Sequence, residues 1–463
     1  MRMKFRTNKN GVPHPGSARV GLHPSRVGAA GRRLRRPGQL LLAAAASLGV
    51  AGLVTACSQL TQTLTVDFVF VTSAKAAGPN NYGEVDVFEI NSESGQMRQI
   101  PTSPFPSGGR NPVAATVSTD NTNLYVVNQD DNTIVQFIIG SDGKVYPQNT
   151  VNTPGVFPIA ISVAQSNLSV TLPGGAAANA KSSLYVADTY QPLPTCSPAS
   201  PCTGSVAVFP ILPAYGSTSI GSLLTKTPIN DCNGLQYVPL TVPGAAGDVV
   251  EPTAINATAN GANLFVSAFD TTANTGYLFA YTVGSLSCPN NTSVPTLTLL
   301  PGSPMLTGVH PSSVTSDPSG TYVYVTDSAS GNVAGYTVSA GGLTAIAGSP
   351  FPAGNQPSSI IVDASGKFAV VANAQDSNIT TYAINGGVLS RVGSFTTGLQ
   401  PVAVGIDPRM NKYIFTANFL GNNVSGFALD VNSGSLLNSQ YSPFTANANP
   451  TAVAAIPHNG SIK

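Results

Sequence analysis

One phrase recurs along this chain, and it constrains the fold more than any other feature of the sequence. The phrase is a proline, a short apolar strand, a tight turn and a second β-rich strand that ends in Asn or Asp. Copies begin at Pro311, Pro357 and Pro401, weaker ones at Pro112, Pro158 and Pro252, and a partial one at Pro450. Four of the six spacings between successive prolines lie between 44 and 49 residues. That period is typical of a four-stranded blade of a β-propeller.

The second strand of the phrase occurs seven times, so the sequence predicts seven blades. These strands begin at Val66, Leu124, Leu184, Leu264, Tyr322, Phe368 and Tyr413. The long interval between Pro158 and Pro252 contains one of them, so it is one blade with insertions. The chain enters on a second strand and leaves on a first strand, PTAVAAI, which can complete the first blade and close the ring. We therefore predict an all-β, seven-bladed β-propeller of four-stranded antiparallel blades, one domain over residues 66–457, followed by a tail, 458–463.

Turn chemistry adds detail within a blade. Residues 317–320 and 363–366 have Asp first and Gly fourth, which suits a type I turn between the first and second strands. The phrase Ser-Pro-Phe occurs at residues 103–105, 349–351 and 442–444. We expect it to end the fourth strand, because proline is tolerated at an outer sheet edge.

Composition supports this architecture and excludes several others. Charged residues make up 9% of the chain, which contains 46 Gly, 37 Pro and no Trp. These values argue against a coiled coil, a mostly helical protein and a charge-rich disordered chain. The formal net charge of +1 hides two unlike parts: residues 1–39 hold ten Lys or Arg and no acid, whereas the chain from Cys57 onward carries −9. A nucleic-acid partner bound through a basic surface is therefore not expected.

The basic N-terminus and the apolar run 40–56 that follows it predict an export signal over residues 1–56. The run is shorter than the ~20 residues that usually span a bilayer. Its end, Val54-Thr55-Ala56-Cys57, resembles the lipobox of bacterial lipoproteins, which implies cleavage before Cys57 and lipidation of that residue. Residues 57–65 would then form a short linker. An ordinary signal with a chance cysteine, or an uncleaved anchor, remains the alternative.

Four further cysteines follow, and an even number in an exported chain suggests two disulfides. Cys196 and Cys202 share the expanded loop 189–204 of the third blade, on the channel-mouth face. Cys232 and Cys288 fall between the third and fourth strands of adjacent blades, on the opposite face. We therefore predict the bridges Cys196–Cys202 and Cys232–Cys288. A zinc site is the weaker interpretation of these four cysteines, because they have no Cys-x-x-Cys spacing and no nearby histidine. No metal and no cofactor are expected.

Strand direction predicts where the polar groups gather. Because strands alternate, the link into each first strand and the turn after each second strand share one face of the disc. The residue before each blade proline should ring one mouth of the channel: Asn111, Phe157, Glu251, His310, Gln356, Gln400 and Asn449. The residues that end the second strands should lie further out on that face: Asn128, Asp188, Asp270, Asp327, Asn373 and Asn418. Two interpretations stay open, a generally polar channel with turn-forming Asx residues, or a ligand site of convergent polar groups.

The strand ends YVTD, VVAN and FTAN resemble those of the YVTN-repeat propellers and of the larger lactonase (6-phosphogluconolactonase-like) family. The resemblance covers about residues 66–457 and implies a seven-bladed propeller. For the lactonases it implies a His, Arg and Glu cluster at the mouth, with Pro-Cys-His and Pro-Arg-His phrases. Neither phrase occurs here, and Val309-His310-Pro311 is the nearest match.

Catalytic candidates are few. Glu251 and His310 open neighbouring blades, and a Glu–His pair within hydrogen-bond reach can perform general acid–base work. The sequence has no Gly-x-Ser-x-Gly nucleophile elbow and no His-Glu-x-x-His metal motif. The acidic turn 128–132 lacks the glycine and the distal Glu of an EF-hand.

These observations predict an exported, lipid-anchored β-propeller that binds a ligand or a protein partner at the cell envelope, on the periplasmic or surface face. Its partners would be the membrane, through the anchor, and a protein or carbohydrate, and the chain is expected to be a monomer. The alternative is a lactonase-like hydrolase with its site at the channel mouth, since one fold hosts many functions. A third interpretation is a structural envelope protein without a small-molecule site.

Overall fold

The computed structural model describes residues 65–77, 81–91, 93–171, 177–212, 223, 227–408 and 410–457. The chain divides into two compact units, Met1–Gln62 and Thr63–Lys463, and all described residues belong to the second. The predicted signal peptide (1–56), the lipidation site Cys57, nearly all of the linker 57–65 and the tail 458–463 lie outside the described residues. The described part of the chain offers no helical membrane span.

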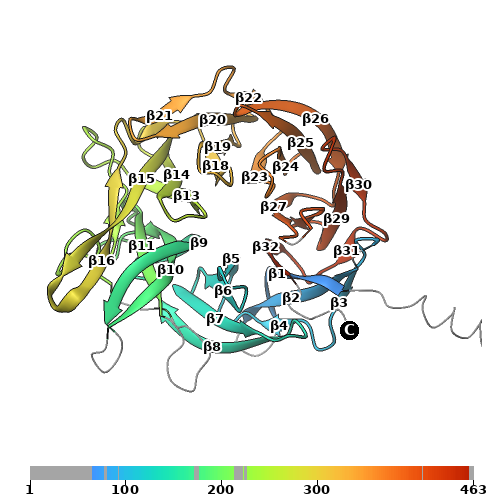
Figure 1. The fold of residues 1–463 in the computed structure, drawn as a ribbon, viewed down its shortest axis with the longest axis horizontal. Helices are drawn as coiled ribbons and strands as arrows, with labels where there is room; N and C mark the ends of the chain where they lie inside the picture. Colours follow the sequence, from blue (N-terminus) through green and yellow to red (C-terminus); the bar gives the residue numbers. More distant parts are fainter. Residues whose placement is uncertain are drawn as a thin grey trace, which may run out of the picture. The chain divides into compact units, whose positions relative to one another are not determined.

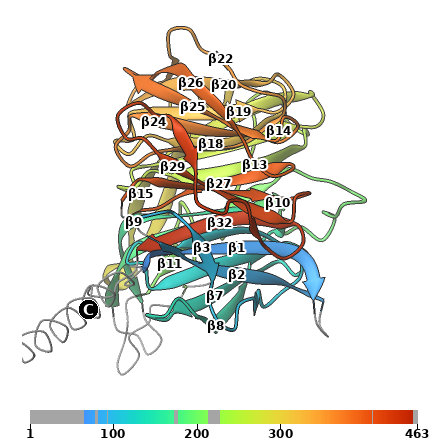
Figure 2. The same cartoon turned by 90° about the vertical axis from the view of Figure 1, so that its right-hand side faces the viewer.

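The described residues form seven antiparallel sheets arranged as blades around a central axis, which confirms the predicted fold (Figure 1). In Figure 1 the first strand of each blade lies nearest the centre: β5, β9, β13, β18, β23, β27 and β32. Figure 2 views the same disc edge-on, with the strands running across it from one face to the other. We call the face with the links into the first strands the mouth face, and the opposite one the far face.

The first three blades have the following strands. Blade 1 consists of β32 (Pro450–Pro457), β1 (Thr65–Ala77), β2 (Tyr82–Asn91), β3 (Met97–Gln99) and the short β4 (Phe105–Pro106). Blade 2 consists of β5 (Pro112–Val117), β6 (Asn123–Asn128), β7 (Thr133–Ile139) and β8 (Val145–Asn152). Blade 3, the one with insertions, consists of β9 (Val156–Thr171), β10 (Ala177–Tyr190), β11 (Ser205–Ile211) and β12 (Val238–Pro239).

The last four blades follow the same order. Blade 4 has β13 (Val250–Ala257), β14 (Asn263–Asp270), β15 (Thr275–Cys288), a 3-10 turn η1 (Pro289–Asn291), β16 (Thr292–Leu299) and β17 (Met305–Leu306). Blade 5 has β18 (Pro311–Ser316), β19 (Tyr322–Asp327), β20 (Asn332–Ser339), β21 (Gly342–Ala345) and β22 (Phe351–Pro352). Blade 6 has β23 (Pro357–Val362), β24 (Phe368–Asn373), β25 (Asn378–Asn385) and β26 (Val388–Thr396). Blade 7 has β27 (Pro401–Ile406), β28 (Tyr413–Asn418), β29 (Asn423–Leu429), β30 (Leu436–Asn438) and β31 (Phe444–Thr445).

The apolar cores lie between neighbouring blades, which explains why the second strands are apolar on both faces. Every residue of β6, β24 and β28 is buried, whereas the first strands β23 and β27 are partly exposed toward the axis. One such core joins Tyr324 and Val333 of blade 5 to Ile360, Ala369 and Val371 of blade 6. Strands rich in Val, Phe and Tyr suit these two-sided positions.

The ring is closed by the C-terminal strand. β32 pairs antiparallel with β1 from Asp67 opposite Pro457 to Ser73 opposite Pro450. Hydroxyl groups just after three blade prolines also join neighbouring first strands. Thr451 Oγ1 donates to the Pro112 carbonyl (2.7 Å), Ser312 Oγ to Pro357 (2.5 Å) and Ser358 Oγ to Pro401 (2.7 Å).

The expectation that Ser-Pro-Phe ends the fourth strand is wrong. The phrase follows that strand, and its Phe begins a separate short strand, β4, β22 or β31, which pairs with the third strand of its blade. The serine hydroxyls explain this position, because they accept backbone N–H groups of the third strand. Ser103 accepts from Val87 (2.8 Å), and Ser349 and Ser442 accept from Gly335 and Gly426 (2.9 Å each). The serine therefore extends the hydrogen-bonding of the third strand beyond the end of the fourth strand.

Both predicted disulfides are present, Cys196–Cys202 and Cys232–Cys288, with Cα–Cα distances of 5.5 and 5.8 Å. The first lies within the loop after β10. The second joins the segment between β11 and β12 to the end of β15, so it links blades 3 and 4.

The two bridges should differ in their contribution to stability. A bridge that closes a longer loop removes more conformational entropy from the unfolded chain. The Cys232–Cys288 bridge spans 56 residues and the Cys196–Cys202 bridge spans 6. We expect replacement of both Cys232 and Cys288 by Ala to lower the free energy of unfolding by ~4 kcal/mol. Replacement of both Cys196 and Cys202 by Ala should lower it by ~2 kcal/mol. Chemical denaturation of the two double variants tests this, and an equal or reversed order would contradict it.

Candidate functional site: the channel mouth

The residues before the blade prolines lie on the mouth face, beside the turns that follow the second strands. Their carbonyl groups accept N–H groups from those turns, as in Asn111 with Gln129 (3.0 Å), His310 with Ser328 (2.9 Å) and Gln356 with Ala374 (2.8 Å). Five of the seven have φ between 51° and 59°: Asn111, Phe157, Gln356, Gln400 and Asn449. Non-glycine residues hold this left-handed conformation only where the surroundings fix it, and such positions concentrate at ligand sites.

A cavity of about 530 Å³ opens among blades 5, 6 and 7, and we call it the mouth pocket. It brings together three of the predicted mouth residues, His310, Gln356 and Gln400. The rest of its lining is Ser312, Ser328, Ala329, Pro357, Ser358, Ala374 and Val402. The pocket thus presents one imidazole, two amides and three hydroxyls, with no Lys, Arg, Asp or Glu in the lining.

His310 is exposed and is held from two sides. Its ring packs on Phe269 at a centroid distance of 4.6 Å, and its Nδ1 lies 3.3 Å from Ser328 Oγ. Ser328 Oγ donates to the His310 carbonyl (3.0 Å), and the His310 N–H donates to Asp327 (3.1 Å). The ring is therefore fixed in position, and its other nitrogen makes no hydrogen bond to any residue of the described ranges.

Glu251 lies toward blade 3 rather than toward His310. In β13 it stands opposite Phe269 of β14, and its carboxylate interacts with the Tyr190 hydroxyl. The pKa of Tyr190 is raised, mainly by burial and secondly by the nearby Glu251 carboxylate. No hydrogen bond or ion pair within the described ranges joins Glu251 to His310. Phe269 is thus a neighbour of both candidates, and the described residues show no bond that would make Glu251 and His310 a dyad.

The other predicted mouth residues make contacts outside the mouth pocket, Asn111 and Phe157 within their own blades and Asn449 with blade 7. Asn111 donates to Gln129 and Asp130 (3.1 Å each), and Asn449 donates to the Phe419 carbonyl (3.3 Å). The Phe157 ring packs edge-on against Tyr190 at 6.2 Å. These three positions shape the mouth face but do not line the mouth pocket.

Arg110, which precedes Asn111, is a cation that the sequence reasoning missed. Its guanidinium pairs with Asp131, with Nε at 2.7 Å and Nη2 at 2.5 Å from Oδ1. Hydrogen bonding to Asp131 raises the pKa of Arg110. Since Arg110 belongs to blade 2 and its charge is matched, it does not supply a cation to the mouth pocket.

The residues that end the second strands are buried anchors rather than ligand groups. Asn373 accepts from the Gly354 N–H (3.0 Å), and Asn128 accepts from Ser107 Oγ (3.0 Å). Asp327 accepts from the N–H groups of Val309 (2.6 Å) and His310 (3.1 Å). Each of them ties the link into the first strand to the turn after the second strand, as the structural interpretation of Asx residues expects.

Two of these anchors differ in electrostatics. Asp188 is fully buried, accepts one N–H from Gly155 (3.1 Å), and has an oxygen, Oδ1, without a hydrogen bond. Burial raises its pKa to about 7. Burial also opposes ionisation of Asp327, but hydrogen bonds from Val309, Ser330 and His310 outweigh it and lower the pKa.

The residues that the sequence reasoning missed in the mouth pocket are the hydroxyls Ser312, Ser328 and Ser358. The repeated Pro-Ser-Ser phrase carried the signal, because the first strand alternates and places Ser312 and Ser358 directly beside the mouth residues. Ser328 lies in the turn after the second strand, where the repeat pattern does not single it out. Within the described ranges, no group of three or more His, Cys, Asp or Glu residues is arranged to hold a metal ion.

Comparison with known proteins agrees with this architecture. Residues 318–454 match the family described as "Lactonase, 7-bladed beta-propeller". Among solved structures, the chain resembles the periplasmic gluconolactonase of Pseudomonas aeruginosa (18% identity, TM-score 0.57, covering 85% of this chain and 99% of that one). It also resembles a protein provisionally described as a 6-phosphogluconolactonase from Bacteroides uniformis (19% identity, TM-score 0.58, covering 85% and 100%).

The comparison with curated proteins gives no match. Residues 318–454 cover blade 5 except for β18, all of blades 6 and 7 and the start of β32, and the structural likenesses extend over most of the chain. The chain has the seven-bladed β-propeller fold of the lactonase type.

Proposed function

We propose that this propeller binds an uncharged, hydroxyl-rich ring of the sugar or sugar-lactone class in the mouth pocket. The observation that carries the proposal is the lining, which combines His310, Gln356, Gln400 and three serines with no charged side chain. Amides, hydroxyls and imidazole both donate and accept hydrogen bonds, as the hydroxyls of a sugar do. A pocket of about 530 Å³ is within the range that holds small ligands.

The lining of the mouth pocket contains no Lys or Arg, which favours a neutral ligand over a phosphorylated one. A phosphate is bound best by Arg or Lys, which supply charge-assisted hydrogen bonds. Arg110 adjoins the predicted mouth residue Asn111, but its charge is matched by Asp131 in blade 2. We therefore favour a neutral lactone or sugar over a phosphosugar lactone, in keeping with the gluconolactonase named among the similar structures.

Hydrolysis of such a lactone is the second candidate function, and His310 is the observation that favours it. The ring is fixed by Phe269 and Ser328, and its free nitrogen can take a proton from a water that attacks the lactone carbonyl. Glu251 has no part in this scheme, because it interacts with Tyr190.

The proposed location is the cell envelope, with Cys57 as a lipid anchor. Two disulfides fit an oxidising, extracytoplasmic compartment. Strand β1 begins at Thr65 on the far face, and eight residues separate Thr65 from Cys57, a contour of at most ~29 Å.

The binding experiment uses gluconolactam, a neutral lactone analogue that resists hydrolysis. We expect saturable calorimetric binding to the full chain and a roughly 10- to 30-fold weaker affinity in the double variant Gln356→Ala/Gln400→Ala, since each lost neutral hydrogen bond contributes about 1 kcal/mol. Gln148→Ala, an exposed glutamine on β8, is the matched control and should bind as the unchanged chain does. Equal affinity in the double variant would place the ligand elsewhere.

A separate assay decides on catalysis. If His310 is a general base, the unchanged chain accelerates hydrolysis of gluconolactone, and His310→Ala loses about 10²- to 10⁴-fold in kcat. Hydrolysis no faster than the spontaneous rate, together with retained gluconolactam binding, would reject the enzyme and keep the binding protein.

A further inference from the structure

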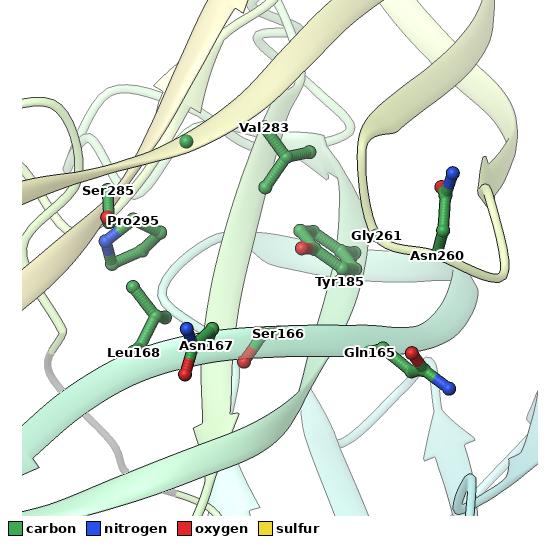
Figure 3. Close-up of a pocket in the computed structure, with 11 residues that line it drawn as sticks. Gln165, Ser166, Asn167, Leu168, Tyr185, Asn260, Gly261, Val283, Ser285 and Pro295 are labelled. Carbon is green, nitrogen blue, oxygen red and sulfur yellow. The ribbon is translucent and has the colours of Figure 1, made fainter.

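A second pocket lies on the far face, between two hairpins that extend beyond the disc. One hairpin is formed by β9 and β10 of blade 3 and the other by β15 and β16 of blade 4. The pocket between them has a volume of about 310 Å³, and we call it the hairpin cleft (Figure 3). It is lined by Gln165, Ser166, Asn167, Leu168, Tyr185, Asn260, Gly261, Val283, Gly284, Ser285 and Pro295.

Contacts between the hairpins close both ends of the cleft. At one end the turn before β14 meets β9 so tightly that a Cβ on Gly261, where φ is +69°, would lie 1.9 Å from the Gln165 carbonyl oxygen. At the other end the Ser169 N–H donates to Ser293 Oγ (3.1 Å), and Ser169 Oγ donates to the Asn291 carbonyl (2.9 Å). The cleft is therefore a bounded cavity rather than an open groove.

The walls are also fixed from the side. The Cys232–Cys288 bridge ties blade 3 to the end of β15. Asn230 adds two hydrogen bonds to β16, from its N–H to the Pro295 carbonyl (3.0 Å) and from the Leu297 N–H to its side-chain oxygen (2.8 Å). A ligand entering this cleft would meet preformed walls, which lowers the entropy cost of binding.

Tyr185 is the observation that points to a ligand. Only 1% of its surface is exposed, and Figure 3 shows it between β9 and β15, with its hydroxyl end directed into the space that the labelled residues surround. Its hydroxyl forms no hydrogen bond with any residue in the described ranges. Two other buried tyrosines are paired, since Tyr324 donates to Gly387 (2.9 Å) and Tyr382 to Pro352 (2.7 Å), whereas Tyr125 is not. Burial raises the pKa of Tyr185, so the phenol stays neutral and can donate to an acceptor that enters the cleft.

The remaining lining limits the chemistry of that acceptor. No charged side chain lines the cleft, so the ligand is uncharged. Gln165, Asn167 and Asn260 offer amide groups, and Leu168, Val283 and Pro295 form an apolar patch. An acetamido group supplies a carbonyl acceptor for Tyr185, a methyl group for the apolar patch and an N–H for an amide oxygen.

We propose that the hairpin cleft is a second binding site, which takes an uncharged sugar carrying an acetamido group. The Tyr185 hydroxyl donates to the acetamido carbonyl, the methyl group packs on Leu168, Val283 and Pro295, and the sugar hydroxyls bond with the amide side chains. The site is separate from the mouth pocket, on the other face of the disc, and does not depend on the function proposed there.

The test measures binding of the N-acetylglucosamine tetramer to the full chain by calorimetry, with the glucose tetramer, which lacks acetamido groups, as the ligand control. We expect saturable binding of the first and at least ~10-fold weaker binding of the second. Tyr185→Phe should weaken binding about 10-fold by removing the one donor to the carbonyl. Val283→Trp should fill the cleft and abolish binding, and the mouth variant Gln356→Ala should leave it unchanged.

Tyr125→Phe is the matched control variant. Tyr125 occupies the equivalent position on β6 of blade 2, is fully buried and also has an unpaired hydroxyl, but it does not line the cleft. Tyr125→Phe should keep or slightly raise the Tm, because it removes an unpaired buried hydroxyl. Tyr185→Phe should keep the Tm, because the Tyr185 hydroxyl borders the cleft and bonds to no other described residue. No saturable binding of the tetramer, equal binding of the glucose tetramer, or undiminished binding in Tyr185→Phe would each overturn the proposal. So would a fall in Tm in Tyr185→Phe alone, because it would show that the hydroxyl is already paired within the fold.

Discussion

A chain that stops after Asn449, and so lacks β32, is expected to lose the closed ring and with it cooperative folding. β32 pairs with β1 from Asp67 to Ser73 and covers Phe68, Val69, Phe70 and Val71, which are at most 3% exposed. Without it, β1 presents an open edge and its apolar side chains to water. The loss is comparable with the whole stability of a domain, about 5–15 kcal/mol. Thermal unfolding followed by circular dichroism measures it.

The control for this truncation is a chain that stops after Pro457, which keeps all of β32. It should unfold at the Tm of the full chain. A chain that ends at Asn449 and still unfolds cooperatively near that Tm would show that blade 1 needs only three strands, and that closure by β32 does not hold the ring together.

The second large effect concerns the buried carboxyl of Asp188. Its folded pKa is raised from 3.8 to about 7, so the folded state binds the proton more tightly than the unfolded state. The contribution of protonated Asp188 to the stability of the folded state is fully present below about pH 4 and is lost as the pH rises through about 7. A shift of this size corresponds to ~4 kcal/mol. Asp188→Asn should therefore stabilise the protein by a few kcal/mol at pH 8 and by almost nothing at pH 4, as measured by denaturant unfolding at both pH values. Three other blades already carry Asn here, at Asn128, Asn373 and Asn418.

Asp327→Asn is the matched variant with the opposite sign. Asp327 occupies the same position in blade 5, but its carboxylate accepts hydrogen bonds from Val309, His310, Ala329 and Ser330, and its pKa is lowered. The contribution of ionised Asp327 to the stability of the folded state is present above about pH 4 and is lost as the pH falls through the lowered folded pKa. The Asn variant should be destabilised at pH 8 by roughly 1.5–3 kcal/mol, because charge-assisted hydrogen bonds are lost. Destabilisation of both variants at pH 8 would contradict the assignment of Asp188 as an unsatisfied buried acid.

The architecture could be predicted because its determinants are local and repeated. Each blade proline marks an inner strand, and each Val-, Phe- and Tyr-rich strand marks a two-sided core position, as β19, β24 and β28 show. The disulfides followed from the same geometry. The Ser-Pro-Phe corner was mispredicted, because the hydrogen bond from Gly335 to Ser349 Oγ joins parts of a blade that sequence pattern does not bring together.

The site could be predicted only in part. Of the residues before the blade prolines, His310, Gln356 and Gln400 line the mouth pocket, whereas the Glu251 side chain interacts with Tyr190 of another blade. Side-chain direction depends on neighbours such as Phe269, and no spacing rule contains that information. The hairpin cleft was beyond sequence reasoning for the same reason, since its walls come from insertions in two blades.

A crystal structure of the full chain with gluconolactam tests the central claim most directly. The account predicts ligand density in the mouth pocket, within hydrogen-bond distance of His310, Gln356 and Gln400. A ligand that binds in solution but is found elsewhere on the propeller, with the mouth pocket unchanged, would contradict it.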